Sequence, residues 1–194
     1  KEAFRVSKVA FTRNRILDFP KLVIAILSNL SKSLSIEVHD MIQTFELAHY
    51  SKQAFSWARL NLKYTAFIFL NDMIIKKYYE DDDYKTFKGR ILLAVDGFSL
   101  NLPNVEKLGR KFGYNKNQNG QGINPIASCI ALYDILNELV ISSSLRRFKT
   151  SERKMAEKGI DSMLKLIPEK KYLLVADRGF PSIGMLSYLV SKNI

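Results

Sequence analysis

The stretch RILLAVDGFSLNLP, residues 90–103, decides the fold of this chain. It is a continuous apolar run followed by an alternation of apolar and polar residues, and both patterns are typical of β-strands. A second stretch, KKYLLVADRGF at residues 170–180, repeats the design. In each stretch an apolar strand is expected to end in an aspartate, Asp96 or Asp177, with a glycine close behind it. The two stretches therefore predict two similar strands of one sheet.

The residues between and after these strands complete an α/β pattern. Residues 124–141 are apolar and predict two further strands joined by a turn. Thr150 or Ser151 is the expected N-cap of a helix with an apolar side at helical spacing, and Pro181 is expected to begin a last helix. The Gly- and Asn-rich residues 113–122 predict a loop. The order β-β-β-α-β-α predicts an α/β fold with a mixed sheet flanked by helices.

The N-terminal part of the chain predicts helices only. Apolar residues recur at helical spacing over residues 19–30 and again over residues 36–47. Ser51 is the expected N-cap of a third helix, KQAFSWARLNL, and a fourth is expected from about residue 65 to 79. The short break before Ser51 permits a DNA-binding helix-turn-helix or an ordinary corner of a helical bundle.

The acidic run EDDD, residues 80–83, ends the helical part. It lacks the glycine and the alternating spacing of a calcium-binding loop, so a solvated helix end or linker is expected. We therefore place a domain boundary here. Residues 1–83 form the helical N-terminal region, which we expect to bind DNA, and residues 84–194 form the α/β domain.

Composition limits the classes of protein open to the chain. With 194 residues and 47% hydrophobic residues it can bury a core, which excludes a disordered chain. One cysteine, Cys129, excludes a disulfide framework and a cysteine zinc cluster and points to a reducing compartment. No apolar run approaches the roughly 20 residues of a membrane span. A cytoplasmic protein without a membrane partner is expected.

The formal net charge of +11 indicates a polyanionic partner, because Lys and Arg release counterions when they neutralise phosphates. A merely soluble basic protein is the alternative. The basic residues gather in three clusters, which suit a long nucleic-acid track better than a membrane patch. The clusters are residues 1–21, then Lys107, Arg110, Lys111 and Lys116, and finally Arg146, Arg147, Lys149, Arg153, Lys154 and Lys158.

Asp96 and Asp177 are the candidate catalytic and metal-binding residues. If their strands are neighbours, the two carboxylates face one another and would bind Mg²⁺ through hard oxygen ligands. Such sites activate a nucleophile and stabilise the leaving oxygen in phosphodiester chemistry. Each aspartate also has a plainer interpretation. Asp96 with Gly97 fits a hairpin turn, and Asp177 fits an ion pair with Arg178 or a cap on the following helix.

Several blocks resemble those of bacterial insertion-sequence transposases of the DDE class, most closely the insertion-sequence-four family. The blocks occur in the family's order and cover nearly the whole chain. They are FTRNRILDFPKLVIAILSNL, SKQAFSWARLNL, GRILLAVDGFSLNLPN, PIASCIALYDILNELVI, SERKMAEKGI and YLLVADRGFPSIGMLSYL.

The resemblance implies an RNase H-like catalytic core in which Asp96 and Asp177 match the first two acidic residues of the catalytic triad. It further implies Mg²⁺ or Mn²⁺, hydrolysis at transposon ends and transfer of the 3′ hydroxyl into target DNA. The implied partners are double-stranded DNA of the transposon ends and target, and a second copy of the chain on paired ends. Lys52, Gln53 and Arg59 become candidate DNA contacts, as do the basic clusters and Arg178.

The family's third carboxylate, in a Tyr-x-x-Arg-x-x-x-Glu-x-x-x-x-x-x-Lys pattern, has no counterpart here. Only residues 178–194 follow Asp177, and none is acidic. Glu152 opens the preceding helix and most simply serves its dipole. The chain is therefore expected to be the N-terminal part of a longer transposase, with an RNase H-like core incomplete at its C-terminus and inactive alone. A DNA-binding remnant without catalysis and a different RNase H-like nuclease are the alternatives.

Overall fold

A computed structural model describes the chain except residues 14, 29–31, 82 and 117–121, and it describes no side chain for residues 116, 122 and 123. Contacts divide the chain into two compact units, Lys1–Leu70 and Asn71–Ile194. The division falls inside a helix, whereas the sequence placed the domain boundary after residue 83.

The first unit is helical, as predicted, and its helices surround a small apolar core. Leu22 and Phe55 are fully buried at the centre of this core, and Val38 and Met41 pack with them. Ser51 caps its helix as predicted, because its hydroxyl oxygen accepts a hydrogen bond of 3.2 Å from the amide of Ala54. The elements are η1 (Glu2–Phe4), α1 (Phe19–Ser28), α2 (Leu34–Thr44), α3 (Lys52–Leu60) and the start of α4 (Thr65–Tyr78).

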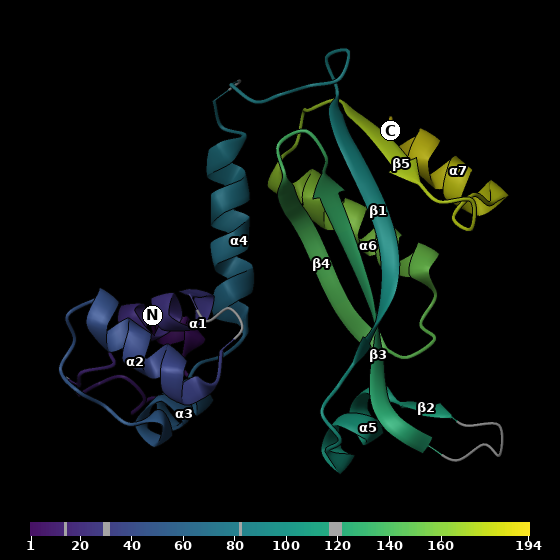
Figure 1. Cartoon of the computed structure of the whole chain (residues 1–194). Coiled ribbons are helices and arrows are strands. Elements are labelled where there is room, and N and C mark those ends of the chain that lie inside the picture. The colour runs from purple at the N-terminus through teal and green to yellow at the C-terminus, as the bar shows by residue number, and fades with distance from the viewer. Residues whose placement is uncertain (14, 29–31, 82, 117–121) are drawn as a thin grey trace. The chain divides into compact units, whose positions relative to one another are not determined.

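The second unit is a mixed five-stranded sheet with helices (Figure 1). β1 pairs antiparallel with β3 and parallel with β5, while β3 also pairs antiparallel with β4 and β2. The predicted α/β class and the predicted order of the four long strands and two long helices are confirmed. The elements are β1 (Ile91–Asn101), α5 (Glu106–Phe112), β2 (Tyr114–Lys116), β3 (Gly122–Asp134), β4 (Leu139–Arg147), α6 (Glu152–Leu166), β5 (Tyr172–Ala176) and α7 (Ile183–Ser191).

Two short elements were not predicted. Helix α5 and strand β2 lie between the first two long strands, and β2 occupies part of the predicted loop 113–122. Pairing with β3 makes Tyr114–Lys116 a strand, because Tyr114 lies opposite Pro125 at the start of that long partner. The remaining loop residues 117–121 lie outside the described residues.

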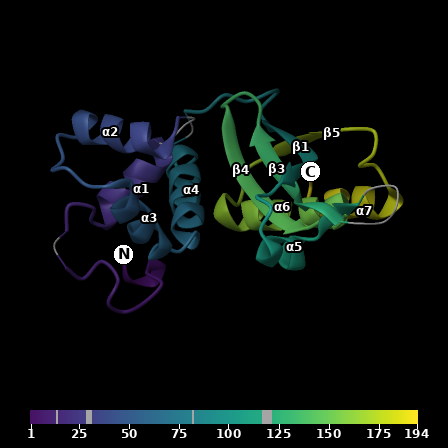
Figure 2. The same cartoon turned by 60° about the horizontal axis from the view of Figure 1, so that its bottom comes forward.

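One face of the sheet carries the core of the second unit. Strand β1 turns Leu93 and Val95 toward this face, where Ile160 and Met163 of α6 pack against them. Helix α6 runs behind the strands in Figure 1, and Figure 2 shows the same layers from another side. The single cysteine, Cys129 on β3, is also buried, and burial raises the pKa of its thiol. On β5, Leu173 and Val175 alternate with the core positions and are exposed.

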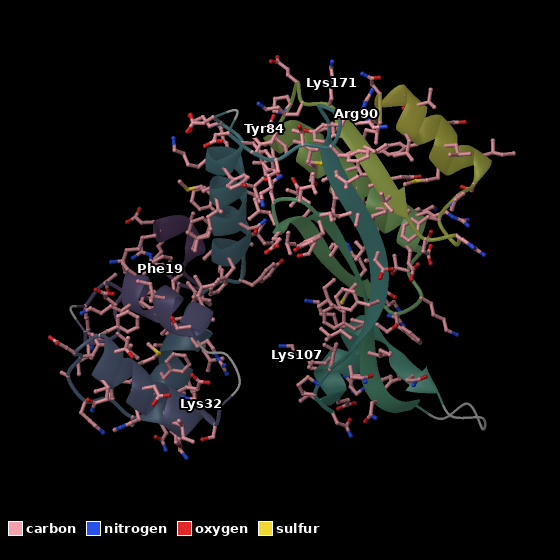
Figure 3. The ribbon with its side chains drawn as sticks, turned by 45° about the horizontal axis from the view of Figure 1, so that its top comes forward. Phe19, Lys32, Tyr84, Arg90, Lys107 and Lys171 are labelled. Carbon is pink, nitrogen blue, oxygen red and sulfur yellow. The ribbon has the colours of Figure 1, made fainter. Side chains whose placement is uncertain are left out.

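The two ends of the sheet differ. Tyr84, Arg90 and Lys171 lie at the end where β1 and β5 begin, and Lys107 of α5 lies at the opposite end (Figure 3). The amide of Ile91 donates to the Lys171 carbonyl at 2.8 Å, which fixes how β5 starts beside β1. The two strands run parallel, but β5 ends opposite Val95 whereas β1 continues to Asn101.

Helix α7 packs against α6 through a polar contact that acid should weaken. Lys192 forms an ion pair of 3.0 Å with Asp161, and the Tyr188 hydroxyl donates to the same carboxylate. The hydrogen bond from Lys192 is the main cause that lowers the pKa of Asp161, and Tyr188 adds to it.

A carboxyl whose pKa is lower in the folded state stabilises that state above its unfolded pKa of about 4, and the contribution is lost as pH falls through the folded value. We therefore expect amide hydrogen exchange in α7 to accelerate below about pH 4, relative to α6. Asp161→Asn should remove this difference between the helices. An α7 whose exchange keeps the same pH dependence in this variant would contradict the expectation.

Candidate functional site

Asp96 lies in the middle of a strand rather than at its end. Strand β1 continues from Ile91 to Asn101, and Asp96 and Gly97 remain paired with Ala131 and Ile130 of β3. The predicted strand end at Asp96 is therefore wrong, since the antiparallel ladder with β3 carries β1 onward. The alternative of a hairpin turn at these two residues is wrong for the same reason.

Asp177 directly follows β5, one residue beyond the last pair that joins β5 to β1. The parallel register ends with Val95 opposite Ala176, so Asp96 and Asp177 are the next residue on each strand. Neighbouring strands lie about 4.8 Å apart. The condition set by the sequence, that the two strands be neighbours, is thus met.

Both carboxylates are exposed and each is held by one backbone amide. The Asp96 Oδ1 accepts from the amide of Gly97 at 2.8 Å, and the Asp177 Oδ1 accepts from the amide of Gly179 at 2.9 Å. No ion pair joins Asp177 to Arg178 within the part of the chain that the structure describes. The second oxygen of each carboxylate has no protein donor among the described residues, which leaves it available to a ligand.

The first turn of α6 reaches both aspartate segments, and the sequence did not predict this. A Cβ atom built on Gly97 would lie 2.6 Å from Cδ of Glu152, so the Glu152 side chain lies directly against this glycine. Arg153 donates from Nε to the Phe180 carbonyl at 3.0 Å and from a terminal nitrogen to the Gly179 carbonyl at 2.7 Å. A cavity of about 320 Å³ lies between this turn and the Gly179 loop.

Glu152 and Asp96 approach β1 from opposite faces. Successive strand residues alternate between faces, so Gly97 shares the α6 face with Val95 while Asp96 points to the other face. Glu152 therefore does not join Asp96 as a third ligand. A glycine inside a strand is a signal of close backbone approach, and Gly97 offered that signal in the sequence.

The second unit brings together two basic clusters that are far apart in sequence. The amide of Phe148, next to the end of β4, donates to the carbonyl of Phe112, the last residue of α5. Lys107, Arg110 and Lys111 lie on α5, and Arg146 and Arg147 end β4 with exposed side chains. Arg110 is paired with Glu106, while the side chain of Lys116 lies outside the described residues. Arg178 is exposed beside Asp177.

The candidate DNA contacts of the first unit are exposed on α3. Lys52 and Gln53 begin this helix and Arg59 lies in its last turn. Their helix is anchored by the buried ring of Phe55. All three belong to the first unit, whereas the aspartates belong to the second.

Metal-ligating side chains do not gather in threes anywhere in the described part of the chain. Among the described helices, none has the length and apolar character needed to cross a bilayer. Comparison with family models, with curated proteins and with solved structures finds no match for this chain.

Proposed function

We propose that the chain belongs to a DNA transposase of the insertion-sequence type, in which Asp96 and Asp177 are the catalytic, metal-holding carboxylates. One observation carries the proposal: the two aspartates occupy the next position on neighbouring parallel strands. An RNase H-like core is the finer fold that we propose. The antiparallel strands β4, β3 and β1, followed by α6 and the parallel strand β5, support it.

The residues present suit a divalent ion in part. Two exposed carboxylates offer hard oxygen atoms, and each keeps one oxygen without a protein donor among the described residues. Mg²⁺ commonly binds one or two carboxylates and completes its shell with water and substrate phosphate. Asp96 and Asp177 would hold it, and the ion would supply charge stabilisation for cleavage of a phosphodiester.

Other residues of the chain orient the two carboxylates and would bind the DNA. The amides of Gly97 and Gly179 orient the two carboxylates, and Arg153 fixes the loop that carries Asp177. The exposed cations of α5 and of the β4 end would bind phosphates of a duplex that lies along this unit. The family resemblance also implies a second copy of the chain on paired DNA ends, and we include this partner in the proposal.

A second candidate is DNA binding without cleavage, and the position of Glu152 favours it. This carboxylate approaches β1 from the face opposite to Asp96, so the described acids supply two ligands on the proposed face. Both candidates predict salt-sensitive binding of duplex DNA, and they differ only in cleavage.

The test combines metal binding with strand cleavage. We expect Mn²⁺, measured by electron paramagnetic resonance, to bind the full chain and to lose most of its affinity in Asp96→Asn and in Asp177→Asn. Asp81→Asn, an exposed acid outside the site, is the matched control and should bind like the parent. Equal Mn²⁺ binding by all four proteins would refute the site. Loss of Mn²⁺ binding in both aspartate variants, or nicking of supercoiled DNA that needs both aspartates, supports the transposase. Salt-sensitive DNA binding with Mn²⁺ binding that neither aspartate affects supports the second candidate.

A further inference from the structure

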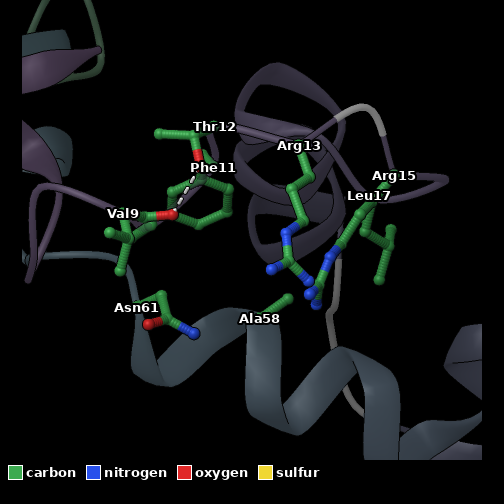
Figure 4. A pocket seen from close by; sticks show the side chains of 9 residues that line it. Val9, Phe11, Thr12, Arg13, Arg15, Leu17, Ala58 and Asn61 are labelled. Carbon is green, nitrogen blue, oxygen red and sulfur yellow. Dashed lines mark hydrogen bonds between the residues drawn. The ribbon is translucent and has the colours of Figure 1, made fainter.

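A groove in the first unit lies between α3 and residues 9–13 and 15–17. Two adjoining cavities of about 400 and about 630 Å³ form it, and they share Arg15, Leu17, Ala58 and Asn61. Figure 4 shows the part next to residues 9–15, with α3 beneath the side chains. The groove belongs entirely to this unit, and two of its lining residues, Arg13 and Arg15, belong to the basic cluster of residues 1–21.

The floor of the groove is one face of α3. Ala54, Ala58 and Asn61 follow at helical spacing, and the two small side chains leave the helix surface open. The amide group of Asn61 is fixed, because it donates to the Trp57 carbonyl at 2.9 Å. The ring of Phe55 on the buried side of α3 holds this floor in place.

Two guanidinium groups enter the groove from above this floor. Arg13 and Arg15 lie side by side over Ala58 (Figure 4). Neither has a hydrogen-bond or ion-pair partner in the described ranges, and no acidic residue lines either cavity. Two adjacent like charges repel each other, so an anion between them would be stabilised by both.

An aromatic ring lines the same cavity as one of these cations, Arg15. Trp57 lines the larger cavity and its side chain is 70% exposed, although large apolar rings are usually buried. An exposed ring next to guanidinium groups is the pairing that proteins use for nucleic-acid strands. The cations hold phosphates, and the ring stacks on a base or packs on a sugar.

We infer that this groove binds the phosphodiester backbone of DNA, with a phosphate between Arg13 and Arg15 and the adjoining sugar or base against Trp57. The identity of the anion as DNA rests on the proposed function. The groove adds a second DNA contact region to α3, on a face that carries no lysine. The two arginines and the ring of Trp57 suit an anion that is flanked by a flat apolar group. An acidic peptide fits less well, because the side chains of Asp and Glu carry no flat apolar group.

The single tryptophan of the chain makes the test direct. The full chain is titrated separately with a DNA duplex, with a single strand of the same sequence and with polyglutamate. The fluorescence of Trp57 is followed in each titration. We expect quenching by DNA at low salt, and the stronger of the two DNA responses identifies the form bound. Arg13→Gln combined with Arg15→Gln should lower the slope of log affinity against log salt by about 1 to 2 for duplex DNA.

A charge-matched control separates the groove from general attraction. Lys85→Gln with Lys88→Gln removes two exposed cations that lie outside the groove and outside the three basic clusters, and it should keep the Trp57 response. If both double variants behave alike, or if polyglutamate quenches as DNA does, the groove inference is overturned while the proposed function stands. If the full chain binds neither form of DNA, the proposed function fails with it.

Discussion

Replacing Asp134 with alanine is expected to destabilise the second unit by about 2–4 kcal/mol, the cost of leaving several buried donors without an acceptor. Asp134 ends β3 and is fully buried. Its carboxylate accepts from the Tyr79 hydroxyl, from the amides of Leu136 and Asn137 and from the Asn137 side chain. It thereby ties the residue that follows α4 to the turn between β3 and β4.

Urea unfolding of the second unit measures this effect, and two further variants apportion it. Tyr79→Phe removes the hydroxyl donor and leaves no buried donor unpaired, so we expect the free energy of unfolding to fall by only about 1 kcal/mol. Burial, and then the hydrogen bond to Asp134, raise the pKa of the Tyr79 phenol, so it stays a donor at any ordinary pH. The double variant should cost less than the sum, because the residues share one bond. An Asp134→Ala protein as stable as its parent would contradict this role.

Arg153→Met is expected to weaken Mn²⁺ binding at Asp96 and Asp177 by about tenfold or more, as changes in the groups behind metal ligands commonly do. Arg153 holds the Gly179 carbonyl, and the amide of the same glycine holds the Asp177 carboxylate. Without the guanidinium the loop gains freedom and Asp177 leaves its position beside β1. Amide exchange of residues 178–180 should accelerate in the same variant.

Lys154→Met is the matched control. Lys154 is exposed and follows Arg153 on α6, and its substitution removes the same charge. It should leave both the Mn²⁺ affinity and the exchange rates as in the parent. Faster exchange with unchanged Mn²⁺ affinity in Arg153→Met would show that the clamp is structural only. The exchange measurement remains informative even if the chain binds no metal, so the contact and the proposed site are tested separately.

Local patterns predicted most elements, and long-range contacts account for what they missed. The apolar runs before Asp96 and Asp177 predicted two strands, and Ser51 predicted the start of α3. The end of β1 was misplaced because an Asp-Gly pair is locally a turn signal, whereas pairing with β3 decides the matter. The same holds for β2, which is a strand only because β3 lies beside it.

For the candidate site, too, local sequence patterns predicted some residues, and the others depend on long-range contacts. The pattern of a strand followed by an aspartate and a glycine selected Asp96 and Asp177, but only the sheet register shows that each follows the last pair of two neighbouring strands. Glu152 and Arg153 could be assigned only to a helix start, because their partners lie far along the chain. Arg13 and Arg15 belonged to a predicted basic cluster, yet their shared groove depends on α3, some forty residues later.

The burial of Cys129 makes the chain convenient for site-specific labelling. A buried thiol with a raised pKa forms little thiolate and reacts slowly with maleimide dyes. A cysteine introduced at an exposed position, for example Lys154 on α6, would therefore take a fluorophore with little competition. With Trp57 as the donor in the other unit, energy transfer to that dye, corrected with the unlabelled chain for direct quenching of Trp57 by DNA, would report how the distance between the two units changes when DNA is added.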